Sequence, residues 1–365
     1  MSLYLDRLTH SYSTETDPVR RAEIAAQIAA VHARRGNFST ARQIIDQVQQ
    51  GFGRGQSSQV TVMKMIAEGL IFHYEKLSPD ANTRFLGALS IAKMFGYRQG
   101  VALAAAWKAH VEFERSDFEC MVESLNLAIA HADPEQHDAW ARIAAVLSNS
   151  YLICDASDLG HSWFLRGHKH AAALGDTETL DALLYNKAAF SVAALRVAAC
   201  ERATEPDLLA RARSEVNSAR NLRQLAGVNA LAAHVDLLNA KLLVLERRFA
   251  DAIDALEAVR LKQPFASHNF HQAQIDLDVA YCETMQARAP GERSARIDFP
   301  AVLEAVSSLD VDERLIAYWM LLEILGRDAD INLRKGIAAL FEQALQVYQS
   351  DRAELRRRLD TLAAC

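Results

Sequence analysis

The sequence predicts an all-α fold built from antiparallel helix pairs that stack on one another. Three observations support this prediction. Alanine and leucine, both strong helix formers, dominate a chain of 365 residues that contains only 15 glycines and 7 prolines. A short phrase recurs at the expected helix-to-helix turns. No segment shows the sustained apolar–polar alternation, bounded by turn residues, that is typical of a strand.

The recurring phrase is a polar turn followed by an aromatic residue. It reads Arg35-Gly36-Asn37-Phe38, Ser116-Asp117-Phe118 and Arg247-Arg248-Phe249. Ala41 and Ala252 follow the first and third copies, about one helical turn after the aromatic residue. Such a unit joins two antiparallel helices and lets them pack closely. Its repetition indicates an array in which each helix pair buries its apolar face against its neighbours.

Prolines and glycines divide the chain into helices. Four prolines follow a capping residue, at Asp17-Pro18, Ser78-Pro79, Asp133-Pro134 and Glu205-Pro206. A proline in that position is accommodated in the first turn of a helix, where its missing N–H costs nothing. Glycines placed to end helices as left-handed C-caps stand at Gly96, Gly175 and Gly227.

The elements follow in order from these signals. After a lead-in segment at residues 1–17, apolar residues at helical spacing predict helices around Ile24–Val31 and Phe38–Val48. Further helices are expected at about 58–77, 81–95, 98–115, 119–132, 135–153, 158–174, 177–200, 206–226, 228–246, 249–261, 268–287, 299–308, 311–326, 331–348 and 351–362. The helix pairs recur roughly every 36 to 50 residues, which suits a helical repeat. We therefore assign residues 18–290 to repeats and 291–365 to C-terminal helical pairs with a capping helix.

The first helix pair carries a more specific pattern. Large, large, small and aromatic positions are filled by Ile24, Ile28, Ala29 and His32, and the turn, wedge and small positions by Gly36, Phe38 and Ala41. In this pattern the chain resembles the tetratricopeptide-repeat family over roughly residues 18–287. Lys108 and Asn239 stand where the first helix of a repeat usually carries leucine, which indicates longer, divergent repeats. The resemblance implies a right-handed α-α superhelix, a TPR-like solenoid, whose first helices line a concave groove for a peptide, protein or small ligand.

Charge and cysteine content limit the kinds of partner and the cellular compartment that we expect for this protein. The 40 basic and 46 acidic residues give a net charge of −6, whereas a nucleic-acid-binding face usually needs a basic excess. Five scattered cysteines fit free thiols in a reducing cytosol. The N-terminus lacks the basic start and apolar core of a signal peptide, and no apolar run reaches about 18 residues. We expect a cytoplasmic protein that contacts neither nucleic acid nor membrane.

No motif predicts catalysis, a metal site or a cofactor. The glycine-rich loop at 51–58 follows no predicted strand and contains no lysine, so we interpret it as a linker and not as a phosphate cradle. No nucleophile-elbow motif is present. Neither group of closely spaced histidines predicts a zinc site, because the first lacks the spacing of three or four residues that chelation on one helix prefers, and the second has no obvious third ligand. These groups are His161, His168 and His170, and His268 with His271.

Polar and aromatic residues within otherwise apolar first helices are the best candidates for ligand binding. A buried lysine or asparagine is costly unless it is paired, and a partly wet groove wall accommodates it at little cost. Amide and ammonium donors on such a wall could bind a peptide backbone or a carboxylate. The candidates are Trp107, Lys108, Asn149, Tyr151, Tyr185, Asn186, Lys187, Asn239 and Lys241.

Three hypotheses for the function follow. The leading one is a non-enzymatic scaffold that binds a protein or peptide in the groove of the array. The second is a ligand- or peptide-sensing module of a bacterial signalling or transcription-control protein, since similar arrays serve there. The third, weakest hypothesis is an enzyme on a helical solenoid scaffold. The sequence also allows a homodimer and leaves the identity of the partner open.

Overall fold

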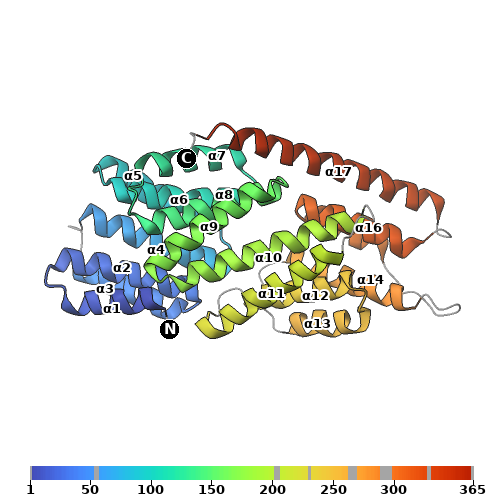
Figure 1. Ribbon diagram of the computed structural model, residues 1–365, viewed down its shortest axis with the longest axis horizontal. Helices are drawn as coiled ribbons and strands as arrows, with labels where there is room; N and C mark the ends of the chain where they lie inside the picture. The colour runs from blue at the N-terminus through green and yellow to red at the C-terminus, as the bar shows by residue number, and fades with distance from the viewer. Residues whose placement is uncertain are drawn as a thin grey trace. The chain divides into compact units, whose positions relative to one another are not determined.

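The computed structural model describes residues 2–52, 57–200, 206–228, 232–261, 269–287, 298–326 and 330–362 (Figure 1). Within these ranges the chain forms seventeen α-helices and no strand, which confirms the all-α prediction. The helices are α1 (Leu3–Thr14), α2 (Pro18–Arg35), α3 (Phe38–Phe52), α4 (Ser58–Lys76), α5 (Asp80–Met94), α6 (Arg98–Glu114), α7 (Phe118–His131), α8 (His137–Ile153), α9 (Ser157–Leu174), α10 (Thr177–Cys200), α11 (Pro206–Ala226), α12 (Ala232–Leu245), α13 (Phe249–Leu261), α14 (Asn269–Gln286), α15 (Phe299–Ser307), α16 (Val311–Leu325) and α17 (Ile331–Leu359).

Two elements differ from the sequence-based expectation. The lead-in segment contains a helix of its own, α1. The prediction of separate helices at 331–348 and 351–362 was wrong, because α17 runs unbroken from Ile331 to Leu359. The serine and aspartate at its middle are weak helix formers, but neither removes a backbone donor as proline does. Beyond this point the helix continues with Leu355 and Leu359, both buried.

The turn within a helix pair contains a residue in the left-handed backbone conformation. In the three copies of the recurring phrase this residue is Gly36 (φ 85°), Ser116 (φ 57°) and Arg247 (φ 58°). Leu77 and Asp155 adopt the same conformation in the α4–α5 and α8–α9 turns. A non-glycine residue there costs roughly 1–2 kcal/mol. The turn is therefore imposed by the packing of the two helices, and glycine is used in only one of these five described turns.

By contact, the chain divides into two compact units. Unit 1 comprises Met1–Asn186, Asn221–Leu231 and Glu354–Cys365, and unit 2 comprises Lys187–Arg220 and Ala232–Ala353. In unit 1 the pairs α2–α3, α4–α5, α6–α7 and α8–α9 pack internally, and first helices contact one another as α2–α4, α4–α6 and α6–α8. In unit 2, α12 packs on α13 and α14, and α14 packs on α16. Local contacts of this kind are typical of a helical repeat.

First and second helices of a pair differ in how they are buried. In α6, thirteen of seventeen residues are buried, from Gly100 to Trp107 and from Ala109 to Phe113. In α9, a second helix, the buried residues are Gly160, Phe164, Gly167 and Ala171, which occupy one face. First helices are packed on several sides because they contact both their own partner and the neighbouring first helices. Polar groups on them are consequently forced into the interior.

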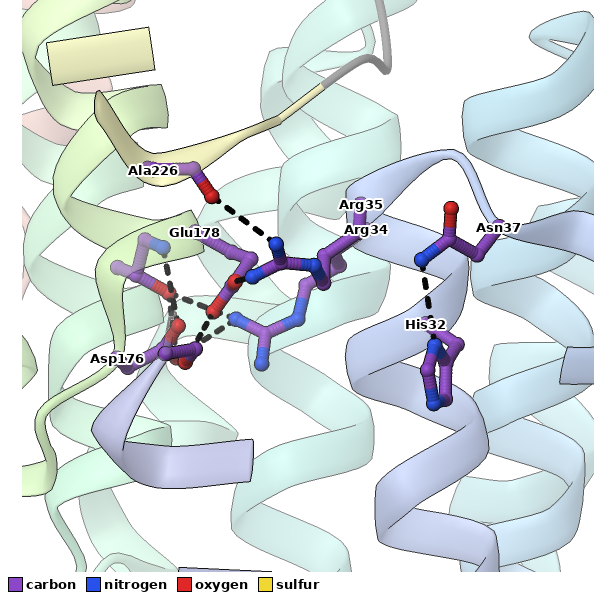
Figure 2. A network of polar contacts seen from close by, with 9 residues as sticks. His32, Arg34, Arg35, Asn37, Asp176, Glu178 and Ala226 are labelled. Atoms are coloured by element: carbon purple, nitrogen blue, oxygen red, sulfur yellow. Dashed lines mark hydrogen bonds and ion pairs between the residues drawn. The ribbon is translucent and has the colours of Figure 1, made fainter. Parts of the chain in front are cut away.

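Within unit 1 the N-terminal helices contact the junction of α9 and α10. The Ser2 hydroxyl donates to Glu178 over 2.9 Å, and the Tyr4 N–H donates to the Gly175 carbonyl over 3.1 Å. Figure 2 shows Arg34 and Arg35, at the end of α2, extending toward Asp176 and Glu178. These contacts bring the start of α10 next to α2, so helices α2, α4, α6, α8 and α10 line a common interior.

Among the described helices, α10 alone is long and apolar enough to cross a membrane by length and composition. Its charged side chains are paired inside the two units. Asp181 accepts hydrogen bonds from Arg223 in unit 1, and Arg196 pairs with Asp278 in unit 2. The four cysteines in the described ranges form no disulfide.

Candidate functional site

The interior of unit 1 contains a small cavity of about 40 Å³. It lies where the first helices converge, and side chains from α1, α2, α4, α6, α8 and the start of α10 line it. Its apolar walls include Met63, Ile66, Leu70 and Leu103. Its polar walls are formed by Tyr4, Gln27, Arg34, Trp107, Asp138, Arg142, Asp176 and Thr179. The volume suits a group of only about three heavy atoms, since one water needs about 10–15 Å³ of such space.

On one side of this cavity, neighbouring groups balance the positive charge of Arg34. Its Nη1 atom lies 2.6 Å from the Asp176 carboxylate (Figure 2). The same atom donates to the Thr179 hydroxyl over 2.9 Å. Burial alone would raise the pKa of Asp176, but the guanidinium of Arg34 lowers it below its usual value. Arg35 forms a second pair, 2.5 Å from Glu178, and donates to the Ala226 carbonyl. This network holds α2 against α10.

On the other side, no described carboxylate pairs with the positive charge of Arg142. Its side chain is 3% exposed, and its guanidinium carbon lies 3.6 Å from the centre of the Trp107 ring. It hydrogen-bonds with the Tyr74 hydroxyl, but its Nε atom has no partner, and no carboxylate in the described part of the chain forms an ion pair with it. Burial, with a further contribution from the positive charge of Arg34, lowers the pKa of Arg142. Arg142 is therefore a buried cation that forms no ion pair with a described carboxylate. The charge of Asp176, which is already paired with Arg34, opposes the fall in the pKa of Arg142 without preventing it.

A cluster of two histidines and a glutamate lies next to Trp107. His73 comes from α4, and His110 and Glu114 come from successive turns of α6. One potential ligand atom from each residue lies within 4.8 Å of the other two. The His73 Nδ1 atom is 3.5 Å and the His110 Nε2 atom 3.3 Å from the Glu114 carboxylate. The His110 ring packs edge-on against Trp107, with 5.7 Å between ring centres, which connects this His–His–Glu cluster to the cavity wall.

Burial among protein atoms shifts the pKa values of all three side chains in the cluster. Burial, assisted by the charge of Arg142, lowers the pKa of His73 to about 3 and that of His110 well below its usual value. Both imidazoles are thus neutral near pH 7. The Glu114 side chain is 39% exposed, yet protein atoms surround it closely enough that burial raises its pKa to about 8, against the opposing effect of Arg142. Glu114 therefore occupies a recess that solvent reaches.

Of the nine binding candidates from the sequence, Trp107 is the one that lines this cavity. The three lysines lie in ion pairs instead: Lys108 with Glu112, Lys187 with Glu215 at 3.2 Å, and Lys241 with Glu313 at 2.7 Å. The remaining candidates are distributed over the two units. Asn149 is buried, Tyr151 lies beneath Arg356, Tyr185 beneath Arg223, Asn186 is half-buried, and Asn239 accepts a hydrogen bond from Arg213 over 2.7 Å. Their binding role stays a prediction.

The histidines singled out from the sequence lie elsewhere. His161 and His168 pack on Phe164, and the Nδ1 atom of His170 lies 3.0 Å from that of His137. His268, the side chain of His271 and residues 53–56 of the glycine-rich loop are outside the described residues. Sequence reasoning missed the His–His–Glu cluster, although the i,i+4 spacing of His110 and Glu114 on one helix was a signal for it.

Unit 2 contains a buried charge cluster of a different kind. Arg196 lies 2.7 Å from Asp278 and 3.0 Å from Glu313, and Lys241 lies 2.7 Å from the same Glu313. Two cations therefore face two anions. This balance indicates a cluster that stabilises the packing of α10, α12, α14 and α16, in contrast to the unbalanced Arg142 of unit 1.

The chain matches no protein-family model and no curated protein. The likeness to tetratricopeptide repeats accordingly depends on the recurring turn phrase and on the local packing of helix pairs. The all-helical architecture with local helix–helix contacts is compatible with a helical repeat.

Proposed function

We propose that this protein is a non-enzymatic, TPR-like binding module that takes a carboxylate group of a peptide or protein partner on Arg142. The observation that carries the proposal is a buried guanidinium in a cavity wall with no anionic partner among the described residues. The proposal includes a solenoid arrangement of the helix pairs and a cytoplasmic location. Their support is the contact of successive first helices and the free thiols.

The burial of Arg142 carries a free-energy cost that a bound anion would offset. Removing a guanidinium from water costs several kcal/mol, and a protein usually offsets this cost with a carboxylate. Arg34 follows that pattern, because Asp176 lies 2.6 Å away. Among the described residues, Arg142 contacts the Trp107 ring and the Tyr74 hydroxyl and forms no ion pair. A ligand carboxylate would supply the missing charge, and a planar guanidinium binds a carboxylate through two parallel hydrogen bonds.

The dimensions of the cavity favour a carboxylate over a larger anion. A carboxylate has three heavy atoms, which is about what 40 Å³ holds, whereas a nucleotide is far too large. Apolar side chains such as Leu70 and Leu103 form the rest of the wall, as in most ligand sites. Burial raises the pKa of Asp138, which also lines the cavity. A peptide C-terminus or an acidic side chain meets these requirements.

Binding of peptides with and without a free carboxylate tests the proposal. A peptide library with free C-termini would be screened against the full chain, and the peptides that bind would be remade as C-terminal amides and with their acidic side chains amidated. We expect binding to depend on one carboxylate and to be lost in Arg142→Met. Arg166→Met is the matched control, because Arg166 lies 4.4 Å from the centre of the Trp163 ring but is exposed. Binding that survives Arg142→Met would contradict the proposal.

A further inference from the structure

We propose that His73, His110 and Glu114 form a binding site for a divalent transition-metal ion of the zinc class. The three residues come from two adjacent helices of unit 1, and one potential ligand atom of each lies within 4.8 Å of the others. Two imidazoles and one carboxylate are a ligand set that proteins use for zinc and for non-haem iron. This inference is independent of the carboxylate site at Arg142 and goes beyond it.

The distances in the cluster suit a shared ion. Ligands bound to zinc at 2.0–2.1 Å in a tetrahedron lie about 3.3 Å from one another. The two imidazole nitrogens lie 3.5 Å and 3.3 Å from the Glu114 carboxylate oxygens, so an ion between them needs only small side-chain movements. His110 and Glu114 are four residues apart on α6, which places both on one face of the helix. The third ligand, His73, comes from the neighbouring first helix α4.

Hydrogen bonding within the protein does not account for this arrangement. Among the described residues, no hydrogen bond of normal geometry joins either imidazole to Glu114, although the three side chains face one another. The His110 side chain is only 7% exposed. Polar side chains buried to this extent normally have a partner. An ion that accepts electron pairs from the imidazoles gives the three side chains a common partner.

Solvent access also suits a metal. Glu114 is 39% exposed, so solvent reaches the cluster from its side, and a fourth coordination position would be open to water or to a ligand. Three protein ligands with one open position are typical of exchangeable or reactive zinc sites, whereas structural sites are closed by four.

Arg142 opposes the ion, and this opposition provides a specific test. Its positive charge acts on all three members of the cluster: it helps to lower the pKa of both imidazoles and opposes the rise that burial causes in the pKa of Glu114. By the same electrostatics it repels a bound cation. Arg142→Met should therefore bind the metal more tightly than the unmodified chain. A merely structural role of the His–His–Glu cluster predicts no such effect.

The experiment uses the full chain, stripped with a chelator and titrated with Zn²⁺ alone by calorimetry, and then with Co²⁺ to report coordination by its visible absorption. We expect one ion per chain, a loss of affinity of more than about 100-fold in His110→Gln and Glu114→Gln, and a gain of at least several-fold in Arg142→Met. The matched control is His170→Gln, because His170 and His137 form another close histidine pair.

Several results would overturn the inference. Absence of stoichiometric binding is one, and unchanged affinity in Glu114→Gln is another. A loss of affinity in His170→Gln with none in His110→Gln would assign the ion to the other pair. Glu114→Gln keeps the test decisive if His110→Gln fails to fold, because the replaced side chain is isosteric and partly exposed. Failure here leaves the peptide measurements with Arg142→Met unaffected, since those measurements use no metal.

Discussion

The two buried arginines of the unit 1 cavity should respond in opposite ways to the same substitution. Arg34→Met removes the partner of Asp176, which is itself buried. Arg142→Met removes a cation that no described carboxylate pairs with. Methionine has a similar length and no charge, so the two substitutions differ mainly in what they leave behind.

The structure gives the expected magnitudes. Breaking a buried ion pair by removing one partner costs about 3–5 kcal/mol, because an uncompensated charge remains, so Arg34→Met should lose that much. Arg142→Met loses a cation–π contact worth about 0.5–2 kcal/mol and a hydrogen bond to a charged group worth about 1.5–3 kcal/mol. It also removes a desolvation penalty of several kcal/mol. These terms nearly cancel, so we expect a change within about 1 kcal/mol in the free energy of unfolding.

Urea unfolding followed by tryptophan fluorescence measures this difference. Three of the four tryptophans, Trp107, Trp140 and Trp163, belong to unit 1, so the signal mainly reports its unfolding. Arg166→Met provides the surface reference, expected within about 0.5 kcal/mol of the unmodified chain. If Arg142→Met destabilised the protein as much as Arg34→Met, Arg142 would have a strong partner inside the protein. Our reasoning about a free guanidinium would then be refuted.

Two further predictions concern a turn and a buried acid. Ser116→Gly should stabilise unit 1 by about 1 kcal/mol in urea unfolding, because Ser116 adopts a left-handed backbone (φ 57°) that glycine tolerates; a destabilisation would contradict this turn geometry. Burial, then the charges of Glu313 and Asp310, raise the pKa of Asp312 in unit 2 from 3.8 to about 6. The folded state therefore binds this proton more tightly, and ionisation lowers stability as pH rises from about 4 to 6. Asp312→Asn should add roughly 1–2 kcal/mol near pH 7, allowing for partial exposure, and nothing near pH 4; an equal gain at both pH values would refute it.

The helices could be predicted from the sequence because their signals are local. Asp17 caps α2 by accepting a hydrogen bond from the Val19 N–H, and Gly175 ends α9 in the left-handed conformation, both as expected. The continuity of α17 was missed because local signals do not determine it. Burial of Leu355 and Leu359 depends on what the helix packs against, and local propensity does not report that.

The candidate site could be predicted only in part. Trp107 was selected from the sequence as an aromatic residue within an otherwise apolar helix, and in the structure it lines the cavity. Lys108 and Lys241 fit the same criterion, but each has an acidic partner that only the packing of helices reveals. The His–His–Glu cluster joins α4 to α6, and the spacing of histidines along the chain does not show which helices become neighbours.

Arg142 illustrates a signal that the sequence did contain. It interrupts an apolar run at residues 139–147, and a charge in such a run must be either exposed or buried with a partner. The sequence does not determine which of these applies. The structure shows that Arg142 is buried on the Trp107 ring, while the nearby Asp176 is already paired with Arg34.

Side-chain NMR of Arg142 tests the carboxylate site most directly. The Nε–H group of Arg142 has no hydrogen-bond partner among the described residues. Its resonance, assigned by its loss in Arg142→Met, should therefore report a ligand. We expect a peptide with a free carboxylate to shift this resonance, and the same peptide as an amide to leave it unchanged. The Arg34 resonance should move less, because Arg34 already binds Asp176. An Arg142 resonance that does not respond to any peptide that binds would contradict the account.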